Sequence, residues 1–350
     1  MNVIVREDLE ELYSRGIKWE RLYGKNVLIT GAYGMLASYA VFMLIYLNEF
    51  HSAGISIYAL GRNEEKARKR FGEYFERNYF SFIKNDLSTP LDNIPKMDFI
   101  IHAASLASSQ FYGTNPVDTA LPNVLGTYEL LRFSVKNKVE SLLFVSSGEV
   151  YGTTNADLIS ENDYGPSDPL DIRYCYGEGK RMGECFCKCF ERQYEVPVKI
   201  VRLGHTYGPT MDLKNDKRVF AEFVSNIVAN EDIVIKSDGS PMRAFCYIAD
   251  AIAGFFKVLL DGKNGEAYNI ANKNGLISIR ELAETLISLY PEKGLAFKYV
   301  PRSVDDDYIE STQKKHNIPD TEKLEKLGWE CRYGINEGFS RTINSFLVEN

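Results

Sequence analysis

The sequence predicts an α/β protein in which a doubly wound parallel sheet is followed by a smaller mixed α/β lobe. Three observations predict it: short apolar runs alternate with helical patterns through the first 204 residues, a glycine turn follows the first run, and the alternation becomes irregular after residue 205. Strands that are apolar throughout are typical of a parallel sheet that helices cover on both faces. The first half of the chain therefore favours a doubly wound domain.

Six apolar runs are predicted as the strands of this sheet. They are KNVLITGA (25–32), ISIYALG (55–61), FSFIKNDL (80–87), DFIIHAA (98–104), SLLFVSS (141–147) and PVKIVRL (197–203). A long apolar helix is expected at about 34–49, and a charged helix begins near Asn63. These elements assign residues 1–23 to an N-terminal extension and residues 24–204 to the sheet domain.

Residues 205–350 are predicted to form mainly the second lobe, partly interleaved with the sheet domain. Helices are expected near 217–230, 249–261 and 278–290, and strands at 232–237, 266–272 and 296–300.

Composition and charge exclude several classes of function. The formal net charge is −7, and acidic and basic residues are interspersed along the 350 residues. This pattern argues against a nucleic-acid partner, which would require clustered basic residues. No run of eighteen apolar residues appears, so no membrane span is expected. The charged N-terminus lacks the apolar stretch of a signal peptide, and a cytoplasmic location is the resulting expectation.

The cysteines and histidines do not predict a metal site. Three of the six cysteines stand in CFCKCF (185–190), within a predicted helix. Side chains two residues apart on a helix point about 200° apart, so these thiols cannot converge on one ion. The four histidines show no ligand spacing. Reduced thiols and no metal are therefore expected.

The turn TGAYGMLAS indicates a dinucleotide-binding Rossmann domain. It places Gly31, Gly34 and Ala37 between the first strand and its helix. The first glycine permits a tight turn, the second lets the backbone approach a diphosphate, and a small third residue allows close helix packing. The helix N-terminus adds free N–H groups for the phosphates.

The end of the second strand leaves the choice of cofactor open. An acidic residue there would favour NAD, because it binds the ribose hydroxyls. The chain has Arg62 and Asn63 instead. Arg62 could accept a 2′-phosphate or could be a solvent-facing arginine at a helix start, so the prediction is NAD or NADP.

The stretch RYCYGEGKR predicts a general base. Tyr176 and Lys180 are four residues apart and share one face of a helix, whereas Tyr174 lies on another face. The tyrosine pKa must fall by about 3 units to reach neutrality, and a lysine together with the positive nicotinamide would supply this. The glycines at 177 and 179 are expected to avoid crowding the cofactor, the sugar or a partner helix.

The fifth strand ends in FVSSGEVYG, at the sheet edge where α/β proteins bind ligands. This turn offers Ser146, Ser147 and Glu149. A serine hydroxyl there can bind both a substrate hydroxyl and a phenolate, and a neighbouring carboxylate can move a second proton. An ordinary polar turn is the alternative interpretation.

Together these motifs resemble the extended short-chain dehydrogenase/reductases of the nucleotide-sugar epimerase/dehydratase kind. The similarity covers about residues 24–345. Its pieces are TGAYGMLAS, NDL (85–87), HAAS (102–105), NVLGT (123–127), SSGEVYG, YGEGK, RLGHTYGP (202–209), RAFCYIADA (243–251) and PDTEKLEKLGW (319–329).

The resemblance implies roles for individual residues. It implies catalysis by Ser147, Glu149, Tyr176 and Lys180, and sugar-nucleotide binding by Ser147, Glu149, His205 and Arg243, with Arg243 holding the diphosphate. It implies contacts with the cofactor for Gly31, Tyr33, Gly34, Met35, Leu36, Ala37, Arg62, Asn63, Asp86, Leu87, Ala103, Ala104, Ser105, Asn123, Ser146, Tyr176 and Lys180.

The implied chemistry begins with oxidation of a nucleoside-diphosphate sugar at C4. Tyr176 as phenolate takes the hydroxyl proton while C4 passes hydride to the nicotinamide, and the 4-ketone makes the C5 hydrogen acidic. A carboxylate on C5 then leaves as carbon dioxide, because the ketone makes the sugar a β-keto acid. Epimerases, 4,6-dehydratases and decarboxylases share this first step.

Four positions bear on the outcome of the reaction and on the sugar. CYGEGKR, GEVYG and Glu149 resemble UDP-glucuronate decarboxylases most. Gly148 replaces the aspartic acid of dTDP-glucose 4,6-dehydratases, which counts against that reaction in its usual form, although GDP-mannose 4,6-dehydratases also lack this aspartate. Asn317 replaces an arginine that decarboxylases commonly carry, which weakens the decarboxylase interpretation. His205 replaces an asparagine usual before TYGP, which suggests a different sugar.

A lyase, by decarboxylation or 4,6-dehydration, is therefore predicted ahead of an epimerase. A 4-keto-sugar reductase and a binding protein without turnover are the remaining alternatives. The resemblance also implies a homodimer formed by helices at about 119–137 and 174–194.

Overall fold

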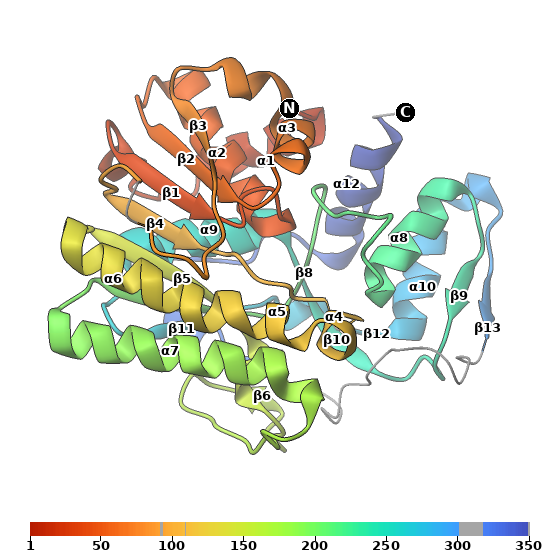
Figure 1. The fold of residues 1–350 in the computed structure, drawn as a ribbon. Coiled ribbons are helices and arrows are strands. Elements are labelled where there is room, and N and C mark those ends of the chain that lie inside the picture. The colour runs from red at the N-terminus through yellow and green to blue at the C-terminus, as the bar shows by residue number, and fades with distance from the viewer. Residues whose placement is uncertain (92–93, 109, 301–317, 349–350) are drawn as a thin grey trace.

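Seven parallel strands form the central sheet, in the order β11-β7-β5-β4-β1-β2-β3 (Figure 1). The computed structural model describes residues 1–91, 94–108, 110–300 and 318–348. The strands are β1 (Asn26–Thr30), β2 (Ser56–Gly61), β3 (Phe80–Lys84), β4 (Phe99–His102), β5 (Ser141–Ser147), β7 (Val198–Leu203) and β11 (Ala267–Ile270). This order confirms the doubly wound α/β class, because strand order reverses on either side of β1.

Strand β11 belongs to the sheet although it comes late in the chain. The pattern at 266–272 predicted a strand, and the structure pairs it with β7 along the sheet edge, with Ala267 opposite Ile200. Helix α9 (Ile248–Asp261), which precedes it, packs against β5 and β7. The second half of the chain therefore contributes both an edge strand and a covering helix to the first domain.

Alternate side chains of the strands enter two separate cores. Val27 and Ile29 of β1 pack on one face with α2 (Met35–His51) and α9, while Leu28 packs on the other face. The second face is covered by α6 (Thr127–Asn137) and α7 (Cys175–Tyr194). Figure 1 shows α6 and α7 lying side by side across the sheet. This two-sided burial explains why the strands read as apolar throughout.

The segment expected as one helix at about 119–137 is divided. Helix α5 (Pro116–Leu121) is followed by a π-helical turn at Pro122–Gly126, and α6 continues from Thr127. Proline lacks the N–H of a regular helical hydrogen bond, which explains the change at residue 122. The short helix α4 (Gln110–Thr114) precedes α5, and α3 (Glu64–Phe71) follows β2.

The second lobe surrounds a small sheet of β8 (His205–Tyr207), β10 (Met242–Tyr247) and β12 (Leu276–Ser278). Strands β9 (Ile233–Ile235) and β13 (Phe297–Tyr299) form one further pair, and β6 (Leu158–Ile159) and β14 (Ile318–Pro319) form another. The helices of this half are α8 (Val219–Ala229), α10 (Ile279–Ser288), α11 (Glu322–Glu325) and α12 (Ile335–Leu347).

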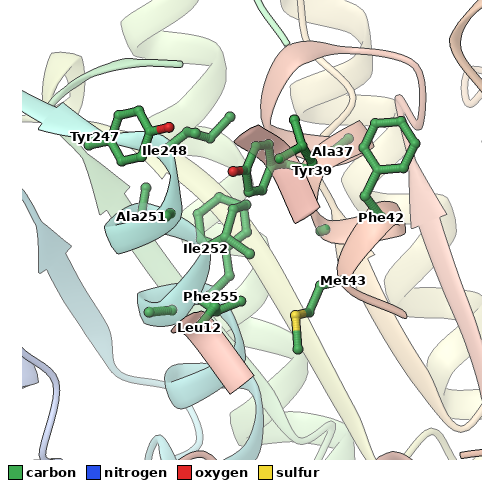
Figure 2. Packing of buried hydrophobic residues seen from close by; sticks show 14 of the residues in the cluster. Leu12, Ala37, Tyr39, Phe42, Met43, Tyr247, Ile248, Ala251, Ile252 and Phe255 are labelled. Carbon is green, nitrogen blue, oxygen red and sulfur yellow. The ribbon is translucent and has the colours of Figure 1, made fainter. Parts of the chain in front are cut away.

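The N-terminal extension forms helix α1 (Val3–Tyr13), which packs on α2, α9 and α12. Figure 2 shows Leu12 of α1 near the side chains of α2 and α9. The buried Asp8 carboxylate accepts hydrogen bonds from the hydroxyls of Tyr39 and Tyr247 and, at 2.6 Å, from Nε of Arg341. Burial raises the pKa of Asp8, and the Arg341 charge opposes that rise.

The glycines of α7 lie against other parts of the protein's own chain, and the expectation that 177 and 179 avoid crowding a cofactor, a sugar or a partner helix stays a prediction. A Cβ on Gly177 would lie 3.1 Å from the Glu149 carbonyl oxygen, and one on Gly179 would lie 3.4 Å from Cα of Ala120. The tight position is Gly183, where a Cβ would lie 2.5 Å from Phe144 and 2.8 Å from the Asn123 carbonyl oxygen. Gly183 thus lets α7 approach β5 and the π-helical turn.

We predict opposite effects for two alanine substitutions in α7. Gly183→Ala should destabilise the fold by about 1–3 kcal/mol, because a backbone oxygen cannot move away cheaply. Gly179→Ala should be neutral or stabilising by up to about 1 kcal/mol, because its Cβ makes ordinary contacts and alanine favours the helix. Urea unfolding of both variants measures this, and equal midpoints would contradict the assignment.

Candidate active site

The glycine turn after β1 forms a cradle that side chains would fill. Gly31 has φ +66, and a Cβ there would lie 2.7 Å from Cα of Ala104 at the end of β4. Gly34 is the N-cap of α2, and no side chain that the structure describes caps this helix. The first N–H groups of α2 are therefore available to an anionic ligand such as a diphosphate.

Two buried polar atoms beside this cradle support the fit of a dinucleotide. Ser105 Oγ, after β4, and Asn123 Oδ1, in the π-helical turn, have no hydrogen-bond partner among the described residues. The amide nitrogen of Asn123 donates to the Thr119 carbonyl at 2.8 Å, which fixes the orientation of the oxygen. Buried polar atoms of this kind are normally satisfied, so both are candidates to bind a cofactor.

His102 holds the elements around the cradle together. Its Nδ1 lies 2.8 Å from Thr30 Oγ1, and its Nε2 lies 3.2 Å from the Pro122 carbonyl. A carbonyl only accepts, so Nε2 carries the hydrogen and Thr30 donates to Nδ1. Burial, followed by the charge of Lys180, lowers the His102 pKa to about 3. The neutral ring thus joins β1, β4 and the π-helical turn.

The residues predicted for the adenosine end lie together beyond β2 and β3. Arg62 and Asp86 are half exposed, and their charged atoms are 4.0 Å apart. Asn63 caps α3, because its Oδ1 accepts from Lys66 N at 2.9 Å. The ring of Tyr33 lies against Gly61, where a Cβ would be 2.6 Å from the ring. Gly61 therefore leaves room for Tyr33.

Tyr176 is buried, and its phenol lies near the half-buried hydroxyl of Ser147. Tyr176 is in the first turn of α7, and Ser147 is the last residue of β5. Burial raises the Tyr176 pKa to about 12, although the hydrogen bond to Ser147 lowers it. To a smaller extent, the charge of Glu149 raises this pKa and that of Arg218 lowers it.

The Lys180 ammonium lies behind Tyr176 and is held by the neighbouring strand. Its ammonium donates to the Val145 carbonyl at 2.6 Å and lies 4.8 Å from the Phe144 ring centroid and 5.8 Å from that of Tyr176. Burial lowers the Lys180 pKa to about 7, and Glu184 opposes that change. The protein's own groups therefore keep Tyr176 protonated at neutral pH, and the proposed phenolate requires a further positive charge.

Glu149 lies in a 3₁₀ turn at Gly148–Tyr151, directly after Ser147. Its backbone N–H donates to Ser147 Oγ at 3.2 Å, and its side chain is 28% exposed. The carboxylate pairs with Arg173, which sequence reasoning did not select. Tyr112 was also missed: its ring is stacked on Tyr176 with centroids 5.4 Å apart and planes at 12°.

Ser146 faces away from the Ser147–Tyr176 pair. Its hydroxyl donates to Glu184 Oε1 at 2.6 Å, and Glu184 also pairs with Arg202 at 2.7 Å. Its side chain is therefore occupied by a structural contact, although the sequence predicted contact with the cofactor. Because Glu184 is one turn beyond Lys180, this network also stabilises the buried ammonium.

Three basic residues of the second half, His205, Arg218 and Arg243, interact with one another, and Arg218 also interacts with Tyr176. His205 begins β8 and is exposed, and β10 places Phe245 opposite it, two residues after Arg243. Loss of hydration around the ring, followed by the charges of Arg243 and Arg218, lowers the pKa of His205. Sequence reasoning missed Arg218. Its charge lowers the pKa of both Tyr176 and His205, and its guanidinium pairs with the Asp216 carboxylate at 2.5 Å.

The structure thus brings together Ser147, Glu149 and Tyr176 and places Lys180 behind them. A spacing signal was available for Arg173, which precedes Tyr176 by three residues. Neither Tyr112 nor Arg218 had such a signal, because each comes from a distant segment. Asn317, whose identity weakened the decarboxylase interpretation, lies outside the described residues.

Among the residues that the structure describes, no three His, Cys, Asp or Glu side chains group as ligands for a metal ion. Nor does any helix of these residues have the length and apolar character needed to cross a membrane.

The family model described as the NAD dependent epimerase/dehydratase family matches residues 27–271. UDP-glucuronic acid decarboxylase 3 of Arabidopsis thaliana is 32% identical over 323 residues, which are 92% of this chain and 89% of the relative. UDP-glucose 4-epimerase of Thermotoga maritima, solved with UDP-glucose, has a TM-score of 0.76 at 23% identity and covers 93% of this chain and 99% of its own.

A third similar protein is the dTDP-glucose 4,6-dehydratase of Bacillus anthracis, solved in complex with NAD. Its TM-score is 0.73 at 22% identity, over 92% of this chain and 96% of its own. At such identities the two solved structures show the fold alone. They agree with the doubly wound sheet described above.

We predict that Lys180→Met stabilises the dinucleotide-free protein in a pH-dependent way. The folded pKa of about 7 lies below the unfolded value of 10.5, so the buried charge costs most below pH 7. The free energy of unfolding should rise by about 3 kcal/mol at pH 6, once the loss of the hydrogen bond to Val145 is subtracted. This increase should shrink towards pH 10. Urea unfolding at several pH values measures it.

The matched control is Lys188→Met, on the same helix but 62% exposed. It should give no comparable gain at any pH. If the stability gained by Lys180→Met grows with pH, or if none is gained at pH 6, then burial does not disfavour the charged form of Lys180.

Proposed function

Since the chain belongs to the NAD dependent epimerase/dehydratase family, we propose that it converts a nucleoside-diphosphate sugar through a transient 4-keto intermediate. The observation that carries this proposal is the contact of Tyr176 with Ser147, with the Glu149 carboxylate beside it. A base and a second proton carrier in one turn suit a reaction that first oxidises the sugar and then acts at its neighbouring carbon.

NAD is the cofactor we propose, because the matched family is NAD dependent and the similar dehydratase was solved with NAD. The Asp86 carboxylate beside Arg62 also disfavours a 2′-phosphate, since like charges repel. The glycine turn, Ser105 and Asn123 would hold the dinucleotide. NAD supplies reversible hydride transfer, which oxidises a sugar alcohol and later reduces the ketone.

The chain's own residues carry the proton chemistry. Tyr176 takes the proton of the sugar hydroxyl, and Ser147 positions that hydroxyl against the phenol oxygen. Lys180, fixed on the Val145 carbonyl, supplies positive charge behind the ring. Arg243 and Arg218 would bind the diphosphate of the substrate, because guanidinium groups suit phosphate oxygens.

Decarboxylation of a UDP-glucuronate-like sugar is the outcome we favour. The relative at 32% identity is a UDP-glucuronic acid decarboxylase. A β-keto acid loses carbon dioxide once the 4-ketone exists, and the remaining carbanion takes a proton. Glu149 is placed to influence that protonation. Gly148 has no acidic side chain, which 4,6-dehydration needs in its usual form. We therefore favour decarboxylation over dehydration.

Epimerisation is the second candidate. It shares the oxidation at C4, and Asn317 replaces the arginine that decarboxylases commonly carry. A 4-keto-sugar reductase would consume its cofactor in each turnover, and a binding protein would show none. The cytoplasmic location stays a prediction.

We predict a mass loss of 44 when the purified protein and NAD are incubated with UDP-glucuronate, because carbon dioxide leaves and the ketone is reduced again. UDP-, dTDP-, CDP- and GDP-hexoses tested in parallel would lose 18 by dehydration, or keep their mass and change retention time by epimerisation. Mass spectrometry distinguishes these outcomes.

Tyr176→Phe is the control, and it should lower turnover by at least about 100-fold while dinucleotide still binds. Unchanged turnover in this variant would refute the proposed base. No product from any of these sugars would refute the proposed function.

We also propose a homodimer through the outer face of α6 and α7. Exposed apolar side chains gather there, from Leu125, Tyr128 and Val135 on one side and Met182 on the other. Tyr128 packs on Phe186 with ring centroids 5.7 Å apart, which joins the two helices into one surface. Contiguous exposed apolar area of this kind is typical of protein–protein interfaces.

We predict that Met182→Asp yields a monomer in sedimentation velocity, because burying an unpaired carboxylate in an apolar interface is unfavourable. Val348→Asp is the matched control, since Val348 is an exposed apolar residue after α12. A dimer that persists in Met182→Asp, or that is equally lost in Val348→Asp, would contradict the proposed face.

A further inference from the structure

Arg173 lies in a 3₁₀ turn at Ile172–Tyr174, directly before α7. Its side chain is only 7% exposed, so its charge needs compensation from the protein. Glu149 supplies it, because Nη2 of Arg173 lies 3.3 and 3.2 Å from the two carboxylate oxygens. This pair connects the turn before α7 with the turn after β5.

Arg173 also touches the ring that covers the catalytic tyrosine. Its guanidinium carbon lies 5.3 Å from the ring centroid of Tyr112, in cation–π contact. Tyr112 is buried and nearly parallel to Tyr176. The three side chains form a column in which a guanidinium, a first ring and the catalytic ring follow one another. The same guanidinium therefore reaches Glu149 directly and Tyr176 through Tyr112.

The charges in this column bear on the proposed base. A carboxylate beside a phenol opposes formation of the phenolate, and Glu149 has this effect on Tyr176. Burial raises the pKa of Tyr112 most, the Glu149 charge adds to that rise, and the Arg173 charge opposes it. At the ring stacked on Tyr176, Arg173 thus offsets part of the negative charge of Glu149.

We propose that Arg173 is a positioning residue that holds Glu149 beside Tyr176 and balances its charge. The base and the carboxylate can then act on one sugar without the carboxylate suppressing the base. The consequence for turnover rests on the proposed function, whereas the coupling of Arg173 to Glu149 does not. The role requires a positive charge at this position, and the guanidinium suits it best because it can reach both the carboxylate and the Tyr112 ring.

The kinetic test uses the full chain with NAD and the sugar nucleotide that the wild type converts. Arg173→Gln should lower kcat about 10- to 100-fold with a smaller change in KM, because positioning affects the reacting state. The rising limb of the pH–kcat profile should move to higher pH, since an unbalanced Glu149 opposes the phenolate. Arg173→Lys should restore part of the loss. In a Glu149→Gln background, Arg173→Gln should lower kcat little further and should leave the rising limb of the pH–kcat profile where it is.

Arg181→Gln is the matched control. Arg181 is on the same helix and donates to the Val150 carbonyl at 2.8 Å, next to Glu149, but pairs with Glu178. The effect of Arg181→Gln on kcat should be additive with that of Glu149→Gln. This substitution should not move the rising limb of the pH–kcat profile. An equally additive, pH-independent effect of Arg173→Gln would overturn the proposal.

A second cycle separates this proposal from the proposed function. Thermal unfolding of wild type, Arg173→Gln, Glu149→Gln and the double variant, all with NAD, needs no substrate. Coupled residues give a double-variant loss of Tm at least about 2 °C smaller than the sum of the single losses. Additive losses would overturn the proposal. If no sugar turns over but coupling is present, the proposed function fails and the positioning of Glu149 by Arg173 stands.

Discussion

One buried hydrogen bond sets the geometry of the site, that from the Lys180 ammonium to the Val145 carbonyl at 2.6 Å. A lysine this deeply buried is costly, and it keeps a proton only where acceptors and negative charge compensate. The bond joins α7 to the C-terminal part of β5. Because Tyr176 lies one helical turn before Lys180, the same bond brings the phenol to Ser147, at the end of that strand.

The structure stabilises this costly arrangement from behind. Glu184, one turn after Lys180, accepts from the Ser146 hydroxyl and pairs with Arg202. Gly183 lets the helix approach β5 and the π-helical turn closely enough for these contacts. In front, Glu149 and Arg173 form a second ion pair. Tyr176 therefore lies between two ion pairs, Glu184–Arg202 behind it and Glu149–Arg173 in front, and in each pair the arginine offsets part of the carboxylate's charge.

Much of this could be predicted from the sequence, because it depends on neighbours along the chain. Apolar runs predicted the strands, and the spacing of Tyr176 and Lys180 predicted their shared face. What could not be predicted depends on distant segments. The pattern at β11 identifies a strand but not the sheet it joins. Tyr112 and Arg218 reach Tyr176 only after folding, and the direction in which the Lys180 ammonium points depends on β5 rather than on its own helix.

The N-terminal extension shows that the two halves of the site are also held from outside the matched family segment, residues 27–271. The Asp8 carboxylate binds Tyr39 of α2, whose first turn forms the glycine cradle. It also binds Tyr247 of β10, the strand that carries Arg243. Removing one partner of a buried charge commonly costs 3–5 kcal/mol. The distance between the dinucleotide cradle and the arginine proposed for the diphosphate is therefore fixed in part by a carboxylate that belongs to neither.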